Sequence, residues 1–198
     1  MMVRQQRKKK KSKAPFLIVI ALILVFLCAA AYFGYKYWIS HTHPIKYSNY
    51  VEKYAEEYNV DKYFVYAVIK TESGFDPSAV SNVGARGLMQ IMEDTFDWIK
   101  FKLGDEETEY ANMFIAEDNI RYGCFFLGYL YNEFGNIETA AAAYHAGRGS
   151  VNSWLKDPQY SSDGIHLDNI PIKDTAHYVN KITKAMDIYI ELYDNQNQ

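Results

Sequence analysis

Residues 71–77 read Thr-Glu-Ser-Gly-Phe-Asp-Pro, and residues 84–90 read Gly-Ala-Arg-Gly-Leu-Met-Gln. In the segment before them, Lys62 to Thr71, apolar side chains recur three to four positions apart, and Asp61 suits the capping position of a helix. This spacing predicts an amphipathic helix. Glu72 falls in its last turn, and the Gly and Pro that follow turn the chain away.

Glu72 is the strongest candidate for a catalytic group. A carboxylate near a helix C-terminus meets the negative end of the helix dipole, and partial burial disfavours its charged form further. Both effects raise the pKa of the carboxyl, which suits a general acid working near neutral pH. Asp76 is the other acid of this segment, but an Asp directly before Pro77 is more typical of a turn cap.

The rest of the chain after the N-terminal region is dominated by helical patterns, and strand signals are scarce. Asp118 and Asn136 suit helix N-caps, whereas Gly104, Gly135 and Gly147 fall where helices should stop. We therefore expect a mainly α domain. The expected helices cover residues 48–58, 62–73, 88–103, 118–134, 137–146, 150–155 and 174–193, with a loop over 157–171.

The N-terminal region predicts a membrane anchor. The first 13 residues hold seven Lys and Arg and no acid, and residues 16–33 form a run of 18 positions without a charge. As a helix, such a run spans roughly 27 Å, close to the thickness of the hydrocarbon core of a bilayer. By the positive-inside rule, the basic end stays in the cytoplasm and the rest of the chain lies outside.

The same segment has two alternative interpretations. A signal peptide would use Ala29 and Ala31 as its cleavage site, but the apolar run exceeds the roughly 7 to 15 residues typical of that class. A lipidated Cys28 would need small residues before it, where Phe26 and Leu27 stand. The expected segments are a cytoplasmic basic N-terminus over 1–15, a transmembrane anchor over 16–38, a linker over 39–47, an extracytoplasmic domain over 48–193 and a C-terminal tail over 194–198.

Charge and motif content exclude several functions. The seven basic residues at the N-terminus are part of a total of 21, which leaves 14 basic against 24 acidic residues, a formal net charge of -10. Nucleic acid is therefore not an expected partner. His41 and His43 form an H-x-H pair, but their surroundings offer no obvious further ligand, so we expect no metal site. Phosphate loops and Ser-His-Asp patterns are absent, and no cofactor is expected.

Four ordered blocks resemble a known family. Beside the segment 72–92, Ala-Ala-Tyr-His-Ala-Gly at 142–147 resembles A-A-Y-N-A-G, residues 149–155 follow it, and Asp-Thr-Ala-His-Tyr-Val at 174–179 resembles E-T-x-x-Y-V. The set is similar to the lytic transglycosylase domain of the soluble-lytic-transglycosylase type, glycoside hydrolase family 23. The resemblance spans about residues 50–189 and implies a lysozyme-like helical fold, related to goose-type lysozyme.

The resemblance also implies roles for single residues. Glu72 matches the catalytic acid, Ser81 a serine beside the cleaved sugar, and Tyr144 the aromatic residue that faces the carboxylate. His145 and Asp174 depart from the Asn and Glu usual there, so we expect a polar contact at both positions but a different positioning of the sugar. The substrate-binding residues expected on these grounds are Ser81, Gln90, Met92, Tyr144, His145, Asp174 and Tyr178.

The implied function is that of a membrane-anchored lytic transglycosylase that cleaves the β-1,4 bond between MurNAc and GlcNAc in peptidoglycan strands during wall remodelling. With one carboxylate instead of the usual pair, Glu72 protonates the glycosidic oxygen and then takes the proton of the sugar's own 6-hydroxyl, leaving a 1,6-anhydro end. The alternatives are a hydrolytic muramidase and a non-catalytic glycan-binding component of an envelope-spanning machine, whose other partners are unknown.

Overall fold

The computed structural model describes residues 14–194, and the chain divides into two compact units, residues 1–44 and 45–198. The first unit holds the long helix α1 (Ala14–Thr42). Among the described helices, α1 is the one that is long and apolar enough to cross a membrane, over Leu22–Thr42. It runs four residues past the expected end of the anchor, because no proline stands between residue 38 and Pro44. The basic residues 1–13 and the end of the tail, 195–198, lie outside the described residues.

The second unit is built from helices, as the sequence predicts, and its described residues form only isolated β-bridges. Its elements are α2 (Ser48–Glu57), α3 (Lys62–Ser73), α4 (Glu93–Leu103), the 3₁₀ helix η1 (Tyr110–Phe114), α5 (Ala116–Phe134), α6 (Ile137–Ala146), α7 (Arg148–Leu155), α8 (Lys173–Tyr189) and the π-helical end η2 (Ile190–Asp194).

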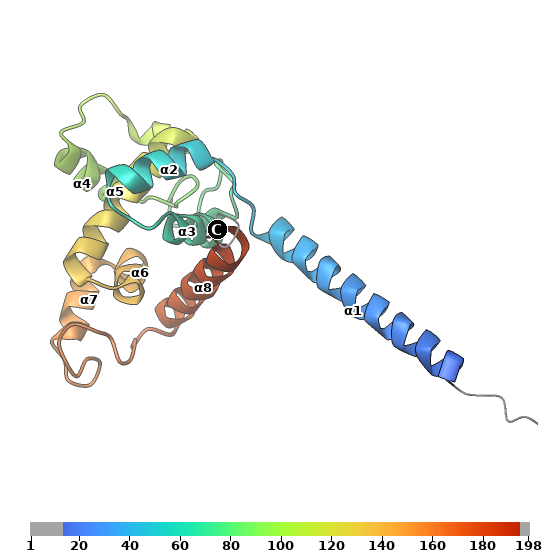
Figure 1. Cartoon of the computed structure of the whole chain (residues 1–198). Helices are drawn as coiled ribbons and strands as arrows, with labels where there is room; N and C mark the ends of the chain where they lie inside the picture. Colours follow the sequence, from blue (N-terminus) through green and yellow to red (C-terminus); the bar gives the residue numbers. More distant parts are fainter. Residues whose placement is uncertain (1–13, 195–198) are drawn as a thin grey trace, which may run out of the picture. The chain divides into compact units, whose positions relative to one another are not determined.

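Helix α3 is the centre of this unit. Figure 1 shows it between α2 and α8, and it packs against both of these helices and against α5. Every residue from Tyr63 to Ile69 is at most 5% exposed. The predicted helix is confirmed, but its amphipathic character is wrong for this stretch, because neighbouring helices cover Tyr63 to Ile69 on every side and leave only residues at the two ends of α3 partly exposed.

Helix ends follow the predicted capping chemistry in most places. Asp61 accepts hydrogen bonds from two backbone N–H groups of the first turn of α3, at 2.7 and 3.3 Å, and Asn136 accepts one at 2.8 Å in α6. Gly104 and Gly135 end α4 and α5 in the left-handed conformation. The assignment of Asp118 as a cap is wrong, because the 3₁₀ helix η1 leads directly into α5 two residues earlier.

The segment 79–92 between α3 and α4 is a compact loop, although a helix was expected from residue 88. Backbone hydrogen bonds join Arg86 to Ile91 in both directions, and Ser81 to Ala85. Gln90 has a positive φ of 50°, which a helix does not permit. Helix α4 therefore begins only at residue 93, and the preceding residues form a tight turn.

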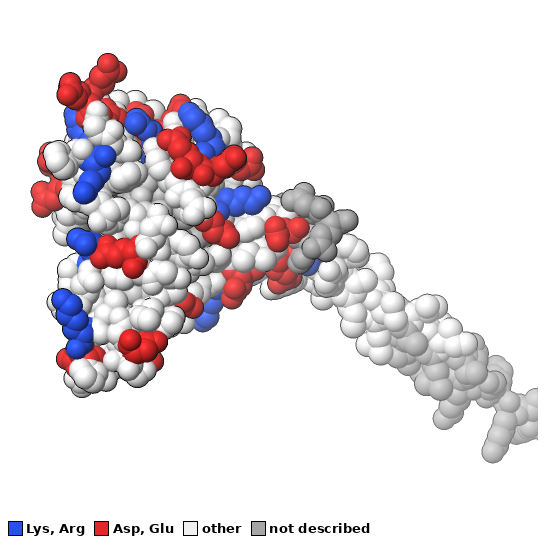
Figure 2. Space-filling view, turned by 60° about the vertical axis from the view of Figure 1, so that its left-hand side comes forward, with Lys and Arg blue, Asp and Glu red and all other residues white. Residues whose placement is uncertain are grey.

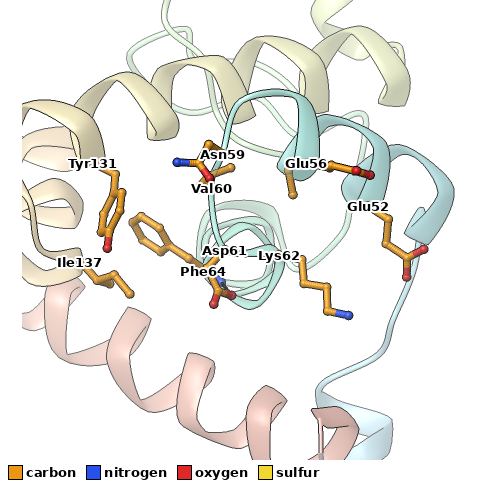
Figure 3. A pocket seen from close by; sticks show the side chains of 10 residues that line it. Glu52, Glu56, Asn59, Val60, Asp61, Lys62, Phe64, Tyr131 and Ile137 are labelled. Carbon is orange, nitrogen blue, oxygen red and sulfur yellow. Dashed lines mark hydrogen bonds between the residues drawn. The ribbon is translucent and has the colours of Figure 1, made fainter. Parts of the chain in front are cut away.

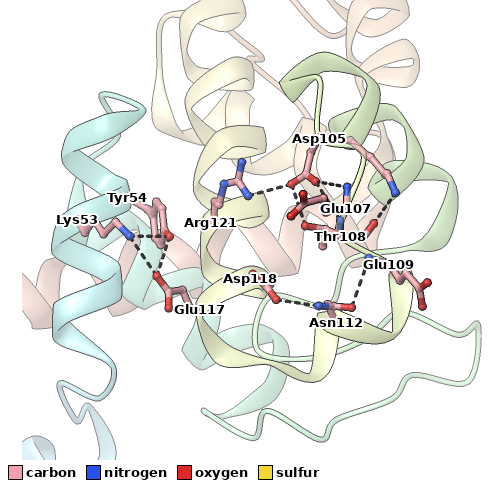
Figure 4. A network of polar contacts seen from close by, with 11 residues as sticks. Lys53, Tyr54, Asp105, Glu107, Thr108, Glu109, Asn112, Glu117, Asp118 and Arg121 are labelled. Carbon is pink, nitrogen blue, oxygen red and sulfur yellow. Dashed lines mark hydrogen bonds and ion pairs between the residues drawn. The ribbon is translucent and has the colours of Figure 1, made fainter.

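A polar network fixes the connection between α4 and α5 (Figure 4). The Asp105 carboxylate accepts hydrogen bonds from the backbone of Glu107 and Thr108, and it pairs with Arg121 of α5 at 2.9 Å. Burial alone would raise the pKa of Asp105, but the hydrogen bonds from Thr108 and its neighbours outweigh burial and hold the pKa well below its usual range. The pair of Lys53 and Glu117 joins α2 to α5 instead, and because both side chains are exposed it adds less to stability than the pair of Asp105 and Arg121.

The same connection supports the loop 79–92. The Tyr110 hydroxyl of η1 lies 2.7 Å from the carbonyl oxygen of Gly84 and 3.0 Å from that of Ile91. The network around Asp105 thus holds the loop in place through η1.

On the face drawn in Figure 2, acidic side chains stand over several parts of the second unit, with basic ones singly between them.

Candidate active site

Glu72 lies in the last turn of α3, where the sequence places it, and is partly buried. The helix ends at Gly74, whose φ of 61° turns the chain away. The neighbouring Ser73 hydroxyl donates a hydrogen bond of 2.8 Å to the carbonyl oxygen of Leu88. This contact ties the end of the helix that carries Glu72 to the loop 79–92.

The Glu72 carboxyl has one defined partner, Tyr178 of α8. The Tyr178 hydroxyl donates to Oε1 of Glu72 at 2.7 Å, and the tyrosine is 6% exposed. Burial raises the pKa of Glu72 from 4.5 to about 7, against the hydrogen bond from Tyr178, which lowers it. A carboxyl with this pKa exists in both protonation states at neutral pH, so it can give a proton and take one back.

Tyr144 lies near Glu72, and its hydroxyl bonds to the adjoining loop. Its hydroxyl donates a hydrogen bond of 2.7 Å to the carbonyl oxygen of Met89, a buried residue of the loop 79–92. The negative charge of Glu72 adds to burial in raising the pKa of Tyr144, so the two groups are neighbours. The residue that holds the carboxyl is nevertheless Tyr178, and Tyr144 supports the adjoining loop.

A pocket of about 260 Å³ opens beside Glu72. Four of the predicted site residues line it, and Thr71, His177 and Lys181 complete its wall; the predicted four are Glu72, His145, Asp174 and Tyr178. The ring of His145 lies 4.6 Å from that of Tyr178, centre to centre, and its Nδ1 is 3.1 Å from the Thr175 hydroxyl. The sequence did not point to His177 and Lys181, which α8 brings to the pocket one and two turns after Asp174.

The other three predicted residues lie apart from this pocket. The Gln90 side-chain amide donates to the carbonyl oxygens of Ala79 and Gly87, at 3.1 and 2.9 Å, and the Ser81 hydroxyl accepts from a backbone N–H at 3.0 Å. Both side chains thus stabilise their own loop. Met92 stands at the start of α4 and is 39% exposed. Asp76 caps a turn, as expected, by accepting from the backbone and hydroxyl of Ser78.

Asn119 of α5 was missed by the sequence analysis. It is fully buried, accepts a hydrogen bond of 2.8 Å from the backbone of Met89, and donates to the carbonyl oxygens of Arg86 and Met113 at 3.0 and 2.9 Å. Two of these hydrogen bonds join the loop 79–92 to α5, and the third joins η1 to the same helix. The only signal in the sequence is an amide that falls on the apolar face of a helix.

A cavity larger than this pocket lies elsewhere in the second unit. Its volume is about 720 Å³, and it lies between α2, the start of α3, α5 and α6 (Figure 3). None of the predicted site residues lines it. Chemistry rather than size identifies the candidate active site, because Glu72 combines burial, a strongly raised pKa and a fixed hydrogen-bond donor. Within residues 14–194, no group of three His, Cys, Asp or Glu side chains is placed to hold a metal ion.

Known proteins that are similar to this chain are lytic transglycosylases. Residues 49–166 match the family model described as the transglycosylase SLT domain. The chain is 31% identical over 169 residues to the soluble lytic murein transglycosylase of Salmonella typhimurium. The matched region covers 82% of this chain and 26% of that protein. It is 29% identical over 166 residues to the membrane-bound lytic murein transglycosylase C of Serratia proteamaculans, over 73% of this chain and 46% of that one. The chain thus spans between a quarter and a half of the length of these relatives.

Solved structures share the fold. An inactive Glu-to-Gln mutant of the lytic transglycosylase Slt from Pseudomonas aeruginosa superimposes with a TM-score of 0.68 and 28% identity, over 77% of this chain and 25% of that chain. The 70-kDa soluble lytic transglycosylase of Escherichia coli gives 0.69 and 27%, with the same coverage, and a 70-kDa soluble lytic transglycosylase is also known in complex with bulgecin A. The predicted fold class, a lysozyme-like helical domain, is confirmed.

Proposed function

This chain belongs to the transglycosylase SLT domain family, and on that basis we propose that it is a membrane-anchored lytic transglycosylase that cleaves the MurNAc-β-1,4-GlcNAc bond of peptidoglycan. The observation that carries this function is the Glu72 carboxyl, partly buried, held by Tyr178 and poised with a pKa of about 7 beside an open pocket. Glycan strands are its substrate, and the reaction uses no cofactor.

The first step is proton donation to the leaving sugar. Tyr178 donates to Oε1 of Glu72, so the acidic proton resides on the other carboxyl oxygen, Oε2, and is available to substrate. Glu72 passes this proton to the glycosidic oxygen as the bond from that oxygen to C1 of MurNAc breaks. The positive charge that develops on the sugar is carried by an oxocarbenium-like state or by the neighbouring N-acetyl group.

The second step returns the proton to the same residue. The Glu72 carboxylate accepts the proton of the 6-hydroxyl, whose oxygen bonds to C1 and closes the 1,6-anhydro ring. No water is consumed, and Glu72 ends the cycle protonated, as it began. Tyr178 stabilises the intervening carboxylate, since a hydrogen bond from a neutral hydroxyl to a charged oxygen is among the stronger kinds.

Product masses test this reaction directly. Isolated peptidoglycan digested by the full chain is expected to give fragments with anhydro ends, each lighter by one water than a hydrolytic product. Mass spectrometry of the digest distinguishes the two. Fragments with only reducing ends would show that water attacks the sugar and that the protein is a hydrolytic muramidase.

A second carboxylate, Asp174, lines the same pocket and has to be considered as a partner in the reaction. Asp174 is exposed at the start of α8, and the shift in the pKa of Glu72 has burial and Tyr178 as its causes, with no carboxylate among them. We therefore assign Asp174 to substrate contact. Paired-carboxylate glycosidases hold their two groups about 5 to 9.5 Å apart, so that each acts on the same sugar.

Asp174→Asn is expected to lower kcat/KM by no more than about tenfold and to leave the anhydro product unchanged, because one contact of a surface carboxylate is worth about 1 kcal/mol. The measurement is the rate of release of soluble fragments, with product masses. His177→Gln, on the next turn of the same pocket wall, is the matched control. If Asp174→Asn lowered kcat/KM as much as replacement of Glu72 does, Asp174 would instead be a second catalytic carboxylate.

Tyr178→Phe is expected to lower kcat about tenfold and to move the alkaline limb of the pH profile upward. The hydroxyl favours the carboxylate form of Glu72, so its removal raises the pKa of Glu72 above about 7. The measurement is kcat/KM between pH 5 and pH 9. Tyr144→Phe is the control, because the Tyr144 hydroxyl donates to the Met89 carbonyl. The same shift in both variants would show that the contact with Tyr178 does not set the pKa.

The anchor in this proposal is α1, with the basic residues of positions 1–13 on the cytoplasmic side and the second unit outside, where the wall lies. The apolar span and the membrane-bound relatives support it. A cysteine-accessibility experiment on intact cells tests the orientation: a single Cys placed in the second unit should react with a membrane-impermeant reagent. Reaction only after lysis would reverse the topology.

A further inference from the structure

One buried polar group of the second unit plays no part in the reaction described above. Tyr66 of α3 is 1% exposed, and its hydroxyl is without a hydrogen-bond partner among the described residues. Buried hydroxyls are nearly always paired with protein or with bound molecules, so an orphaned one marks a place where a ligand or water completes the site. Burial raises the pKa of Tyr66, and the charge of Glu52 raises it further, so the hydroxyl stays a neutral donor.

Tyr66 lines a recess of about 160 Å³, enough for roughly five water molecules. The recess is at the N-terminal end of α3. Since Lys62 and Glu72 are ten residues apart on this helix, the recess and the catalytic carboxyl are separated by about 15 Å. The other residues of its wall are Ile45, Glu52, Lys62, Tyr63 and Tyr193.

The recess offers both signs of charge. Glu52 comes from α2 and Lys62 from α3, and both line it. Within the described part of the chain no ion pair joins these two side chains, and Figure 3 shows them extended beside the gap between their helices. Tyrosine rings form much of the remaining wall, and the face of an aromatic ring favours a cation. A ligand with one ammonium and one carboxylate group would satisfy both charges at once.

The recess also continues into the larger cavity between α2, the start of α3, α5 and α6, called the larger groove below. Glu52 and Lys62 line the 720 Å³ cavity of Figure 3 as well, so the two hollows meet at this pair. A ligand whose charged end fills the recess therefore has room for a longer chain along α2 and the start of α3. Peptidoglycan, the substrate proposed above, carries peptide stems, and a diaminodicarboxylic acid in such a stem, when its second end is unlinked, offers a free ammonium and a free carboxylate group on one carbon.

We propose that the recess at Tyr66 binds a zwitterionic amino-acid group, with its ammonium at Glu52 and its carboxylate at Lys62 and the Tyr66 hydroxyl, and that a peptide stem of the glycan supplies this group. The choice of the stem as the source rests on the proposed function. The binding chemistry itself rests on the recess alone. The protein thereby holds a peptide-bearing strand at a point remote from the bond that Glu72 cleaves.

The first experiment titrates the full chain in detergent micelles with D-alanine, followed by NMR shifts of the protein. Saturable shifts are expected for the zwitterion, and N-acetyl-D-alanine and D-alanine amide should each bind at least tenfold more weakly, since each lacks one charge. Equal shifts with all three compounds, or no saturation with D-alanine, would mean that the recess holds water only and would overturn the proposal.

Variants locate the site. Tyr66→Phe should weaken D-alanine binding about tenfold without lowering the melting temperature, because it removes a hydroxyl that has no hydrogen-bond partner within residues 14–194. Glu52→Gln should weaken binding similarly, whereas Glu56→Gln, which lines only the larger groove, should not. If Tyr66→Phe binds D-alanine as the native protein does, the hydroxyl is a core group and the assignment fails.

The source of the ligand is decided with glycan fragments. Disaccharides whose peptide stem holds an unlinked diaminodicarboxylic acid should bind at least as tightly as D-alanine and compete with it, whereas the same disaccharide without peptide should not compete. Exclusion of the peptide-bearing fragment would limit the site to free amino acids and overturn the stem assignment. The outcome is separable from the lytic activity: Glu72→Gln should keep D-alanine binding, and Tyr66→Phe should still cleave peptide-free glycan.

Discussion

Replacement of Glu72 by Gln is expected to lower kcat/KM on isolated peptidoglycan by at least about 10³-fold, because one residue supplies the proton in the first step and removes it in the second. Gln has nearly the same shape and accepts the same hydrogen bond from Tyr178, but it cannot exchange a proton. The measurement is the release of soluble fragments by the full chain. Undiminished release would end the catalytic assignment and favour a glycan-binding role.

The same variant should fold at least as well as the native chain. Folding raises the pKa of Glu72 from 4.5 to about 7, so the folded state binds the proton more tightly than the unfolded state. The resulting stability is fully present below pH 4.5 and is lost as the pH rises through about 7. Above that pH, Glu72→Gln is expected to be more stable than the native chain by about 2 kcal/mol, after allowance for partial exposure of the carboxyl.

Denaturant titrations at pH 4 and pH 8 measure this difference. The native chain and Glu72→Gln should differ in free energy of unfolding only at the higher pH. A charged carboxylate in a partly buried site costs free energy that a neutral amide avoids. A variant that is less stable than the native chain at pH 8 would show that Glu72 is not held in a desolvated site. Loss of activity could not then be attributed to the missing proton alone.

Gly87→Ala is expected to destabilise the protein by more than about 4 kcal/mol or to prevent folding, with loss of activity. A Cβ atom at this position would lie 2.0 Å from the Met113 carbonyl oxygen and 2.3 Å from Nδ2 of Asn119. Neither neighbour can retreat easily, since one is backbone and the other is fixed by hydrogen bonds to Met89, Arg86 and Met113. The loop would have to leave α5.

Gly84→Ala is the matched control, three residues earlier in the same loop. The φ angle is 75° at Gly87 and 89° at Gly84, so alanine is strained at both positions. A Cβ atom at Gly84, however, meets nothing within 4 Å. Gly84→Ala should therefore cost only about 1 kcal/mol. Chemical denaturation of both variants in detergent micelles compares them. An equal decrease in the free energy of unfolding of both variants would show that backbone strain, and not the close approach to α5, makes Gly87 necessary.

The local features were accessible from the sequence because they depend on near neighbours. The cap at Asp61, the stop at Gly135 and the position of Glu72 in the last turn of α3 each follow from a few consecutive residues. The apolar run of α1 and the order of the four blocks are likewise properties of the chain itself.

The contacts that make the site were decided by packing between distant segments. Tyr178 reaches Glu72 across 106 positions of sequence, and Asn119 reaches Met89 across 30, so no local pattern indicates that Tyr178 rather than Tyr144 holds the carboxyl. Burial of the middle of α3, Tyr63 to Ile69, on all sides removed its expected amphipathic character. Desolvation by those neighbours, more than the helix end, raises the pKa of Glu72, because the cost of burying a charge depends on everything that surrounds it.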